Sequence, residues 1–195
     1  MRALFVVLLL AGAQPGESVT AEFRVFAGDE EITATTRLRV TPTGKRDRPR
    51  DVEQGPRPST TLAPGIYDVQ VLRLRQESVV AIRWAERLVV MQYPDEAGRH
   101  LEVINFETGF GALQVRPARG EMSAYDVAVF AAGERTTPAA SPVTGDGYTL
   151  FVLPAGRYDI RVRHASDPPD ADHSHWLLDV EVPADRTRMK QIDVP

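Results

Sequence analysis

Two copies of one short motif decide the fold of this chain: Leu62 to Val71 reads LAPGIYDVQV, and Leu153 to Val162 reads LPAGRYDIRV. In each, proline and glycine follow the leucine within three residues, and they favour a turn because proline presets φ and glycine tolerates positive φ. Tyrosine and two β-branched residues then alternate with aspartate and a polar residue, the two-residue period of a half-buried strand. Each copy therefore predicts a tight corner that leads into a β-strand.

Further matches on both sides of the motif indicate that a whole domain is duplicated. They occur in the same order in both halves and at nearly constant spacing. The matched pairs are Phe23–Val25 with Leu113–Val115, Gly65–Asp68 with Gly156–Asp159, Trp84 with Trp176, and Ile104–Phe106 with Ile192–Val194. Each half also holds about six or seven short alternating segments, which is the pattern of a β-sandwich.

The expected fold is all-β, with two tandem immunoglobulin-like or transthyretin-like β-sandwich domains at residues 14–108 and 109–195. The boundary falls within Glu107 to Gly111, which is short and contains two glycines. We therefore expect the two domains to sit close together and to share a small interface.

The N-terminus has the pattern of a secretory signal peptide, residues 1–13. Arg2 supplies a positive charge, Ala3 to Ala11 form an apolar run, and Ala11-Gly12-Ala13 offers a small-residue cleavage site. The run is shorter than the roughly 20 residues that span a bilayer. The sequence therefore predicts an exported protein, periplasmic or extracellular, with no transmembrane segment in the mature chain.

The composition narrows the possible functions. The 195 residues are 43% hydrophobic and 26% charged, which is ordinary for a globular protein. A net charge of −4 argues against nucleic-acid binding. The chain has no cysteine, so it can form no disulfide and has no thiolate nucleophile.

The stretch from Thr144 to Val162 resembles the carboxypeptidase regulatory-domain-like superfamily, whose members are transthyretin-like, seven-stranded sandwiches. The resemblance rests on Asp146-Gly147-Tyr148 followed by LPAGRY and a second strand. It covers the middle of the second half well and the first half only at its corner. It implies a non-catalytic binding or structural module that contacts a protein partner or another component of the cell envelope.

The segment from His164 to His175 is a candidate metal site. His173 and His175 could lie on one face of a strand, with Asp170 and Asp172 nearby as further ligands. The alternative is a solvated hairpin loop in which aspartate and proline make the turn. A metal-dependent enzyme at this loop is one alternative function, with His164 as a further binding candidate.

Arg46, Arg48 and Arg50 form a basic segment that could bind a polyanion such as an acidic glycan or a lipid headgroup. Interspersed acidic residues favour the alternative, a solvated loop.

Trp84 and Trp176 could be sugar-stacking platforms of a carbohydrate-binding module, but their apolar strands favour core positions. Tyr67 and Tyr158 are predicted corner tyrosines whose hydroxyls bond to the preceding chain. No nucleophile elbow, zinc-protease motif or phosphate-binding loop is present, so we expect neither catalysis nor a cofactor.

Overall fold

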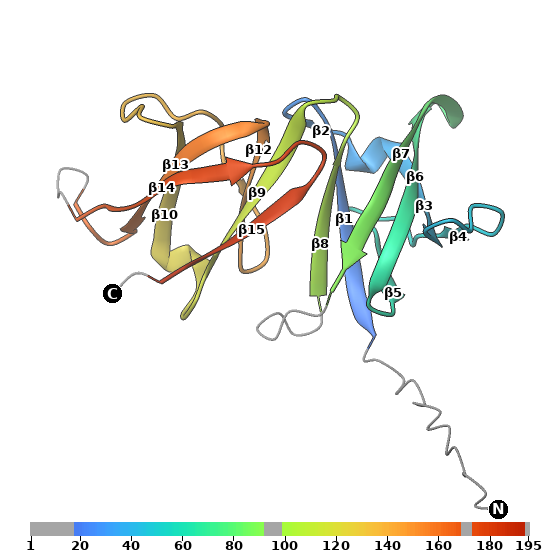
Figure 1. Cartoon of the computed structure of the whole chain (residues 1–195), viewed down its shortest axis with the longest axis horizontal. Helices are drawn as coiled ribbons and strands as arrows, with labels where there is room; N and C mark the ends of the chain where they lie inside the picture. Colours follow the sequence, from blue (N-terminus) through green and yellow to red (C-terminus); the bar gives the residue numbers. More distant parts are fainter. Residues whose placement is uncertain (1–17, 92–98, 169–172, 194–195) are drawn as a thin grey trace, which may run out of the picture.

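The computed structural model describes residues 18–91, 99–168 and 173–193, and in these ranges the chain is all-β (Figure 1). The strands of the first half are β1 (Val19–Ala27), β2 (Glu30–Glu31), β3 (Thr36–Pro42), β4 (Arg50–Asp51), β5 (Ser59–Leu62), β6 (Gly65–Arg75), β7 (Ser78–Val90) and β8 (Arg99–Asn105). Those of the second half are β9 (Phe110–Pro117), β10 (Tyr125–Ala131), β11 (Val143–Thr144), β12 (Thr149–Pro154), β13 (Gly156–His164), β14 (His175–Val182) and β15 (Thr187–Ile192). Two short 3₁₀ turns, η1 (Thr33–Thr35) and η2 (Met122–Ala124), precede β3 and β10. The all-β prediction is confirmed, and the predicted signal peptide lies outside the described residues.

The described strands form four sheets, which we name by their place in the molecule. The first outer sheet has the order β4-β3-β6-β7, and in the first inner sheet β1 pairs with β2, β5 and β8. The second inner sheet has the order β11-β12-β9-β15, and the second outer sheet the order β10-β13-β14. In Figure 1 these four sheets follow one another from right to left. In each inner sheet the first strand of the half pairs in parallel with the last, β1 with β8 and β9 with β15.

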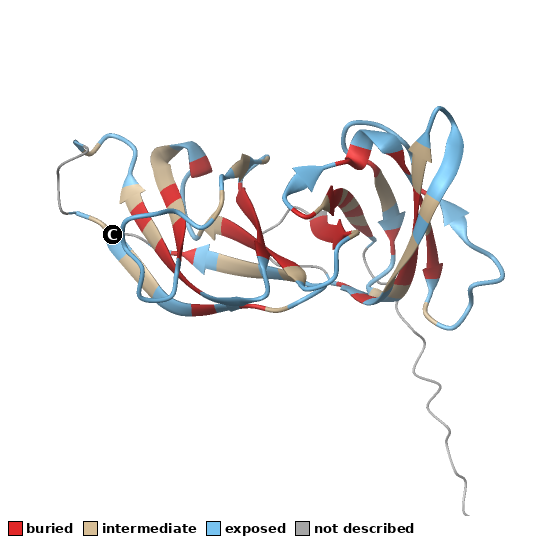
Figure 2. Cartoon of the chain, turned by 90° about the horizontal axis from the view of Figure 1, so that it is seen from above, coloured by how far each residue is buried: buried red, intermediate tan, exposed pale blue. Residues whose placement is uncertain are grey.

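Three apolar clusters fill the spaces between the sheets. One lies between the first outer and first inner sheets and includes Phe23 and Val71. Another lies between the second inner and second outer sheets and includes Phe151 and Ile160. In Figure 2 the buried positions gather on the strands, whereas most connecting loops are exposed. Both cores follow the period-two alternation that predicted the strands.

The third cluster lies between the two inner sheets and joins the halves of the chain. Its buried members are Phe26, Leu101 and Val103 from the first half and Ala112, Tyr148, Leu150 and Val152 from the second. The two inner sheets therefore bury apolar side chains on both faces. This shared apolar cluster holds the two halves together. The alternation within either half does not predict it, because its members come from both halves.

The register of the inner sheets corrects one sequence match. Leu62 of the first corner pairs with Val19, and Leu153 of the second corner pairs with Gly111. This pairing aligns Val19 with Gly111, so Phe23 corresponds to Val115. The predicted match of Phe23 with Leu113 was therefore two positions off. A shift of two keeps every side chain on its face, so the alternation alone could not detect it.

The two tryptophans lie on the outer faces of the outer sheets, so the prediction of core positions is wrong. In each half a β-bulge contains a residue with positive φ, Arg87 (φ 56°) in β7 and Asp179 (φ 59°) in β14. One extra residue reverses the alternation along the rest of the strand. Val90 stays in the core while Trp84 turns outward, and Trp176 turns outward in the same way; both indoles are half-buried.

Candidate functional site

The repeated corner is held by its tyrosine, as predicted. The Tyr67 hydroxyl donates a hydrogen bond to the Ala63 carbonyl (2.8 Å), and the Tyr158 hydroxyl donates one to the Pro154 carbonyl (2.7 Å). Both bonds reach back four residues and fix the turn from which β6 or β13 begins. The role of these tyrosines is structural.

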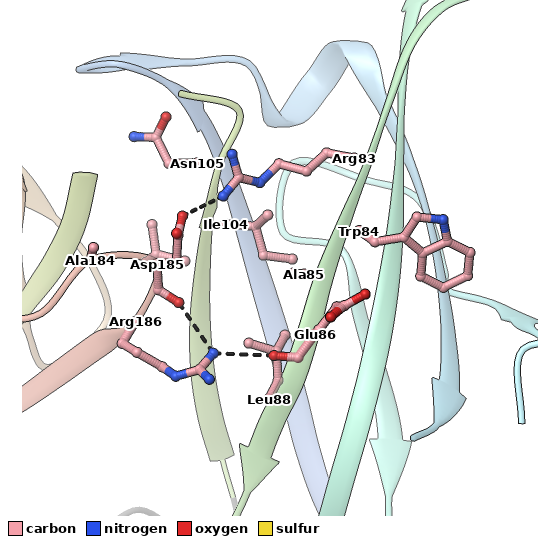
Figure 3. Close-up of a pocket in the computed structure, with 11 residues that line it drawn as sticks. Arg83, Trp84, Ala85, Glu86, Leu88, Ile104, Asn105, Ala184, Asp185 and Arg186 are labelled. Atoms are coloured by element: carbon pink, nitrogen blue, oxygen red, sulfur yellow. Dashed lines mark hydrogen bonds and ion pairs between the residues drawn. The ribbon is translucent and has the colours of Figure 1, made fainter. Parts of the chain in front are cut away.

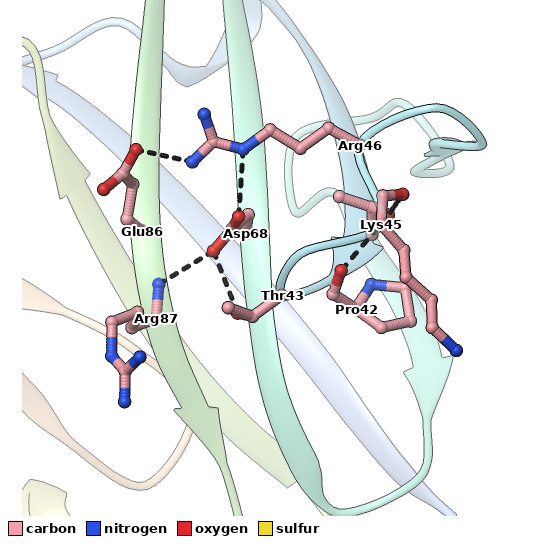
Figure 4. Close-up of polar contacts among 8 residues, drawn as sticks. Pro42, Thr43, Lys45, Arg46, Asp68, Glu86 and Arg87 are labelled. Carbon is pink, nitrogen blue, oxygen red and sulfur yellow. Dashed lines mark hydrogen bonds and ion pairs between the residues drawn. The ribbon is translucent and has the colours of Figure 1, made fainter.

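The aspartate that follows the first corner tyrosine organises a polar cluster on the first outer sheet (Figure 4). Asp68 is 2% exposed and accepts hydrogen bonds from the Arg87 backbone N–H (3.0 Å), the Thr43 hydroxyl (2.9 Å) and Arg46 Nε (3.0 Å). Burial by itself would raise the pKa of Asp68, but these three bonds outweigh it and lower the pKa. The carboxylate thus secures both the bulge at Arg87 and the loop that carries Arg46.

The second half repeats this arrangement with other loop residues. Asp159 accepts hydrogen bonds from the backbone N–H groups of Gly133 (2.9 Å) and Asp179 (2.8 Å) and from Arg135 Nη1 (2.6 Å). These bonds, led by that of Gly133, lower the pKa of Asp159 to about 2. In both halves the aspartate therefore ties down the bulge of the neighbouring strand.

The arginine held by each aspartate covers a tryptophan. The guanidinium carbon of Arg46 lies 4.5 Å from the Trp84 ring centre, and that of Arg135 lies 4.2 Å from the Trp176 ring centre. Phe130 also packs near Trp176, with ring centres 5.4 Å apart. A guanidinium over the indole is a favourable cation–π contact and occupies the surface on which a sugar would stack.

The structure does not bring the three predicted basic residues together. Arg46 is engaged with Asp68 and with Glu86 on β7. The Arg48 side chain is 92% exposed, and Arg50 donates to the Thr60 hydroxyl and to a backbone carbonyl of β5. Arg46 therefore has a structural role, for which the sequence signal was the matching arginine, Arg135, in the second half.

The histidine candidates lie at the open end of the second outer sheet. His164 is exposed, accepts or donates one hydrogen bond with Ser166 through Nδ1 (2.8 Å) and packs edge-on against Tyr125. His173 and His175 are exposed, and Asp170 and Asp172 lie outside the described residues. In the described ranges no three His, Cys, Asp or Glu residues are grouped closely enough to hold a metal ion.

A cleft of about 390 Å³ lies where the two halves meet (Figure 3), and the sequence did not predict it. Arg83 and Glu86 of β7 line one side, and the β14–β15 turn with Asp185 and Arg186 lines another. Arg83 forms an ion pair with Asp185, and Arg186 Nη1 donates to the Glu86 backbone carbonyl (3.2 Å). The charges at the cleft are thus used to hold the halves together, and the side chains drawn there include no nucleophile beside a general base.

The most exposed apolar side chains of the described chain lie mainly along β7. Val79, Val80 and Ile82 are 50%, 55% and 57% exposed, and Val89 and Met91 extend the series beyond the bulge. Among the described strands β7 pairs only with β6, so its other edge is unpaired.

Fold and site together define an all-β protein of stacked sheets whose candidate surfaces are an apolar edge strand and a polar junction cleft. In the described ranges no helix is long and apolar enough to cross a bilayer. No protein-family model matches the chain, and no curated protein matches it.

Comparison with solved structures finds distant likenesses over most of the chain. The Bacillus anthracis TIE protein is 14% identical with a TM-score of 0.30; the match covers 91% of this chain and 33% of that protein. The tip fimbrial protein Mfa3 from Porphyromonas gingivalis is 8% identical with a TM-score of 0.33, covering 92% of this chain and 96% of that one. GBS52, a minor pilin of Streptococcus agalactiae, is 10% identical with a TM-score of 0.30, covering 92% and 97%. At this level of likeness none of them says what this chain binds.

Proposed function

We propose that this chain is an exported, non-catalytic binding module that holds a protein partner on its β6–β7 ribbon. Residues 1–13 are the signal peptide in this proposal. Residues 14–108 and 109–195 are two transthyretin-like sandwich domains, and the ribbon belongs to the first. Catalysis has no part in the proposal.

The exposed apolar side chains of β7 carry the proposal. Natural edge strands are short, charged or covered, because an exposed apolar edge invites association. β7 is thirteen residues long, and Val79, Val80 and Ile82 are each at least half exposed. Exposed apolar side chains gathered in one place are the usual mark of a surface that another molecule covers.

The second half supplies an internal comparison. β14 occupies the place of β7 in the second outer sheet, yet it is eight residues long. Leu178 is its one large apolar side chain that is more than a third exposed. The outer sheets share the order β3-β6-β7 and β10-β13-β14. A feature that differs between these equivalent strands is not required by that order, which supports a functional reason for it.

Site-specific photo-crosslinking tests the proposal. A photoreactive residue at position 82 is expected to capture a discrete protein partner in the native envelope or secreted fraction. The same residue at position 178 is the matched control, because Leu178 is equally exposed on the equivalent strand. Identical labelling at the two positions, or none at position 82, would refute the proposal.

A substitution separates binding from folding. Ile82→Ser is expected to abolish capture by a photoreactive residue at position 80. Because Ile82 is 57% exposed, the same change should alter the free energy of unfolding by less than about 1 kcal/mol. Undiminished capture would show that the partner does not contact this face.

A further inference from the structure

We infer that the segment bound by the β6–β7 ribbon is an acidic, extended stretch of a partner protein that alternates carboxylates with apolar side chains; this rests on the proposed function. The ribbon presents the outer face of the first outer sheet, where Arg37 of β3 lies in register with the exposed Ile82 of β7.

One row of side chains crosses this face from β3 through β6 to β7. Arg37 pairs with Leu72, and Leu72 pairs with Ile82, so the three side chains share one row. Neighbouring strands lie about 4.8 Å apart, so the Arg37 backbone is roughly 10 Å from that of Ile82, within reach of an extended arginine side chain. The apolar side chains of β7 are thus bordered by a cation on their own face.

The arginines of this face differ in how their charge is compensated. Arg39 is paired with Asp51 (3.0 Å), as Arg46 is with Asp68. Arg37 is exposed and has no carboxylate or hydrogen-bond partner among the described residues. The uncompensated charge beside the apolar side chains is therefore positive, except for Glu77 in the turn.

A partner that covers the apolar side chains would also desolvate Arg37. A carboxylate opposite Arg37 would compensate its charge with charge-assisted hydrogen bonds. A second copy of this chain packed on the same face would instead bring Arg37 against Arg37 or its neighbours, which is unfavourable. The charge distribution therefore favours an acidic partner over self-association.

The turn of the ribbon argues for a protein segment and against a lipid surface. Gln76 and Glu77 form the tip, and both are exposed. A hairpin entering an anionic bilayer would insert this tip first, placing a carboxylate among anionic headgroups. The exposed apolar residues lie along the strand behind the tip, where an extended segment can lie beside them.

Defined probes test the inference on the full chain. A labelled octapeptide alternating valine and glutamate is expected to bind, and its valine–lysine counterpart to bind at least about tenfold more weakly. Arg37→Glu should weaken binding of the acidic peptide by about tenfold or more. Arg119→Glu, the same charge change at an exposed arginine of the second half, should leave it unchanged. Vesicles of phosphatidylserine and phosphatidylcholine serve as the lipid probe.

Each outcome decides between the alternatives. No binding of the acidic peptide, equal binding of both peptides, or equal effects of the two substitutions would overturn the inference. Binding to the vesicles without binding to the acidic peptide would assign the face to a membrane. If position 82 still captures a protein partner while these peptide tests fail, the inference falls and the proposed function stands; loss of that capture refutes both.

Discussion

Replacing Asp159 with asparagine tests the account of the repeated corner most directly. Asp159 is 4% exposed; one carboxylate oxygen accepts the Asp179 N–H, and the other accepts the Gly133 N–H and Arg135. Asparagine has a single acceptor oxygen, so in either orientation its NH₂ group faces a backbone N–H donor. The bulge of β14 or the loop before Arg135 loses its acceptor, and the arginine loses its counter-charge.

The size of the effect follows from the pKa of Asp159. A folded pKa of about 2, against an ordinary value of 3.8, corresponds to about 2 kcal/mol of folding free energy at neutral pH. Hydrogen bonds to a charged group give a similar figure of about 2–3 kcal/mol. Because the folded pKa is depressed, this stabilisation is present above about pH 4 and is lost as the pH falls through about 2.

Urea unfolding followed by circular dichroism at several pH values measures the effect. Asp159→Asn is expected to unfold about 2–3 kcal/mol more easily at pH 7, and the difference from the unsubstituted chain should shrink between pH 4 and pH 2. Asp126→Asn is the control, because Asp126 lies on the same sheet and forms an ion pair with Arg163. The Asp126 side chain is 42% exposed, so this ion pair is worth at most about 1 kcal/mol. Equal unfolding free energies for the two variants, or a difference independent of pH, would refute the reasoning.

Three further substitutions test the packing between the halves, a close backbone approach within the second half, and the hydrogen bond of the second corner. Leu150→Ala removes a fully buried side chain from the cluster between the inner sheets, so it should lower the unfolding free energy by about 2–5 kcal/mol and speed proteolysis at the junction. Gly111→Ala places a Cβ 2.1 Å from the Pro183 carbonyl oxygen, a backbone atom, and should cost about 2–3 kcal/mol by urea unfolding; an unchanged midpoint would contradict the close approach. Tyr158→Phe removes one hydrogen bond, to Pro154, and should lower the melting temperature by an amount equivalent to about 1 kcal/mol.

The candidate surfaces could be predicted only in part. The exposure of Val79, Val80 and Ile82 could not be predicted, because a run of apolar residues reads the same in the sequence whether or not another element covers it. The basic segment was visible in the sequence, yet the pairing of Arg46 with Asp68 joins residues 22 positions apart and could not be read from either. The position of Arg37 could not be predicted, because the residues that share its row, Leu72 of β6 and Ile82 of β7, are far from it in the sequence.

By itself the sequence determined the all-β class, the two corners and their tyrosines, because turns and period-two alternation are local and need only neighbouring residues. Only the tertiary structure decided which face each tryptophan occupies. That depends on bulges at Arg87 and Asp179, which are not glycines and are held in a left-handed conformation by aspartates on the adjacent strands. The cluster between the inner sheets was likewise settled by tertiary packing, since Phe26 and Leu150 acquire their burial from each other's half of the chain.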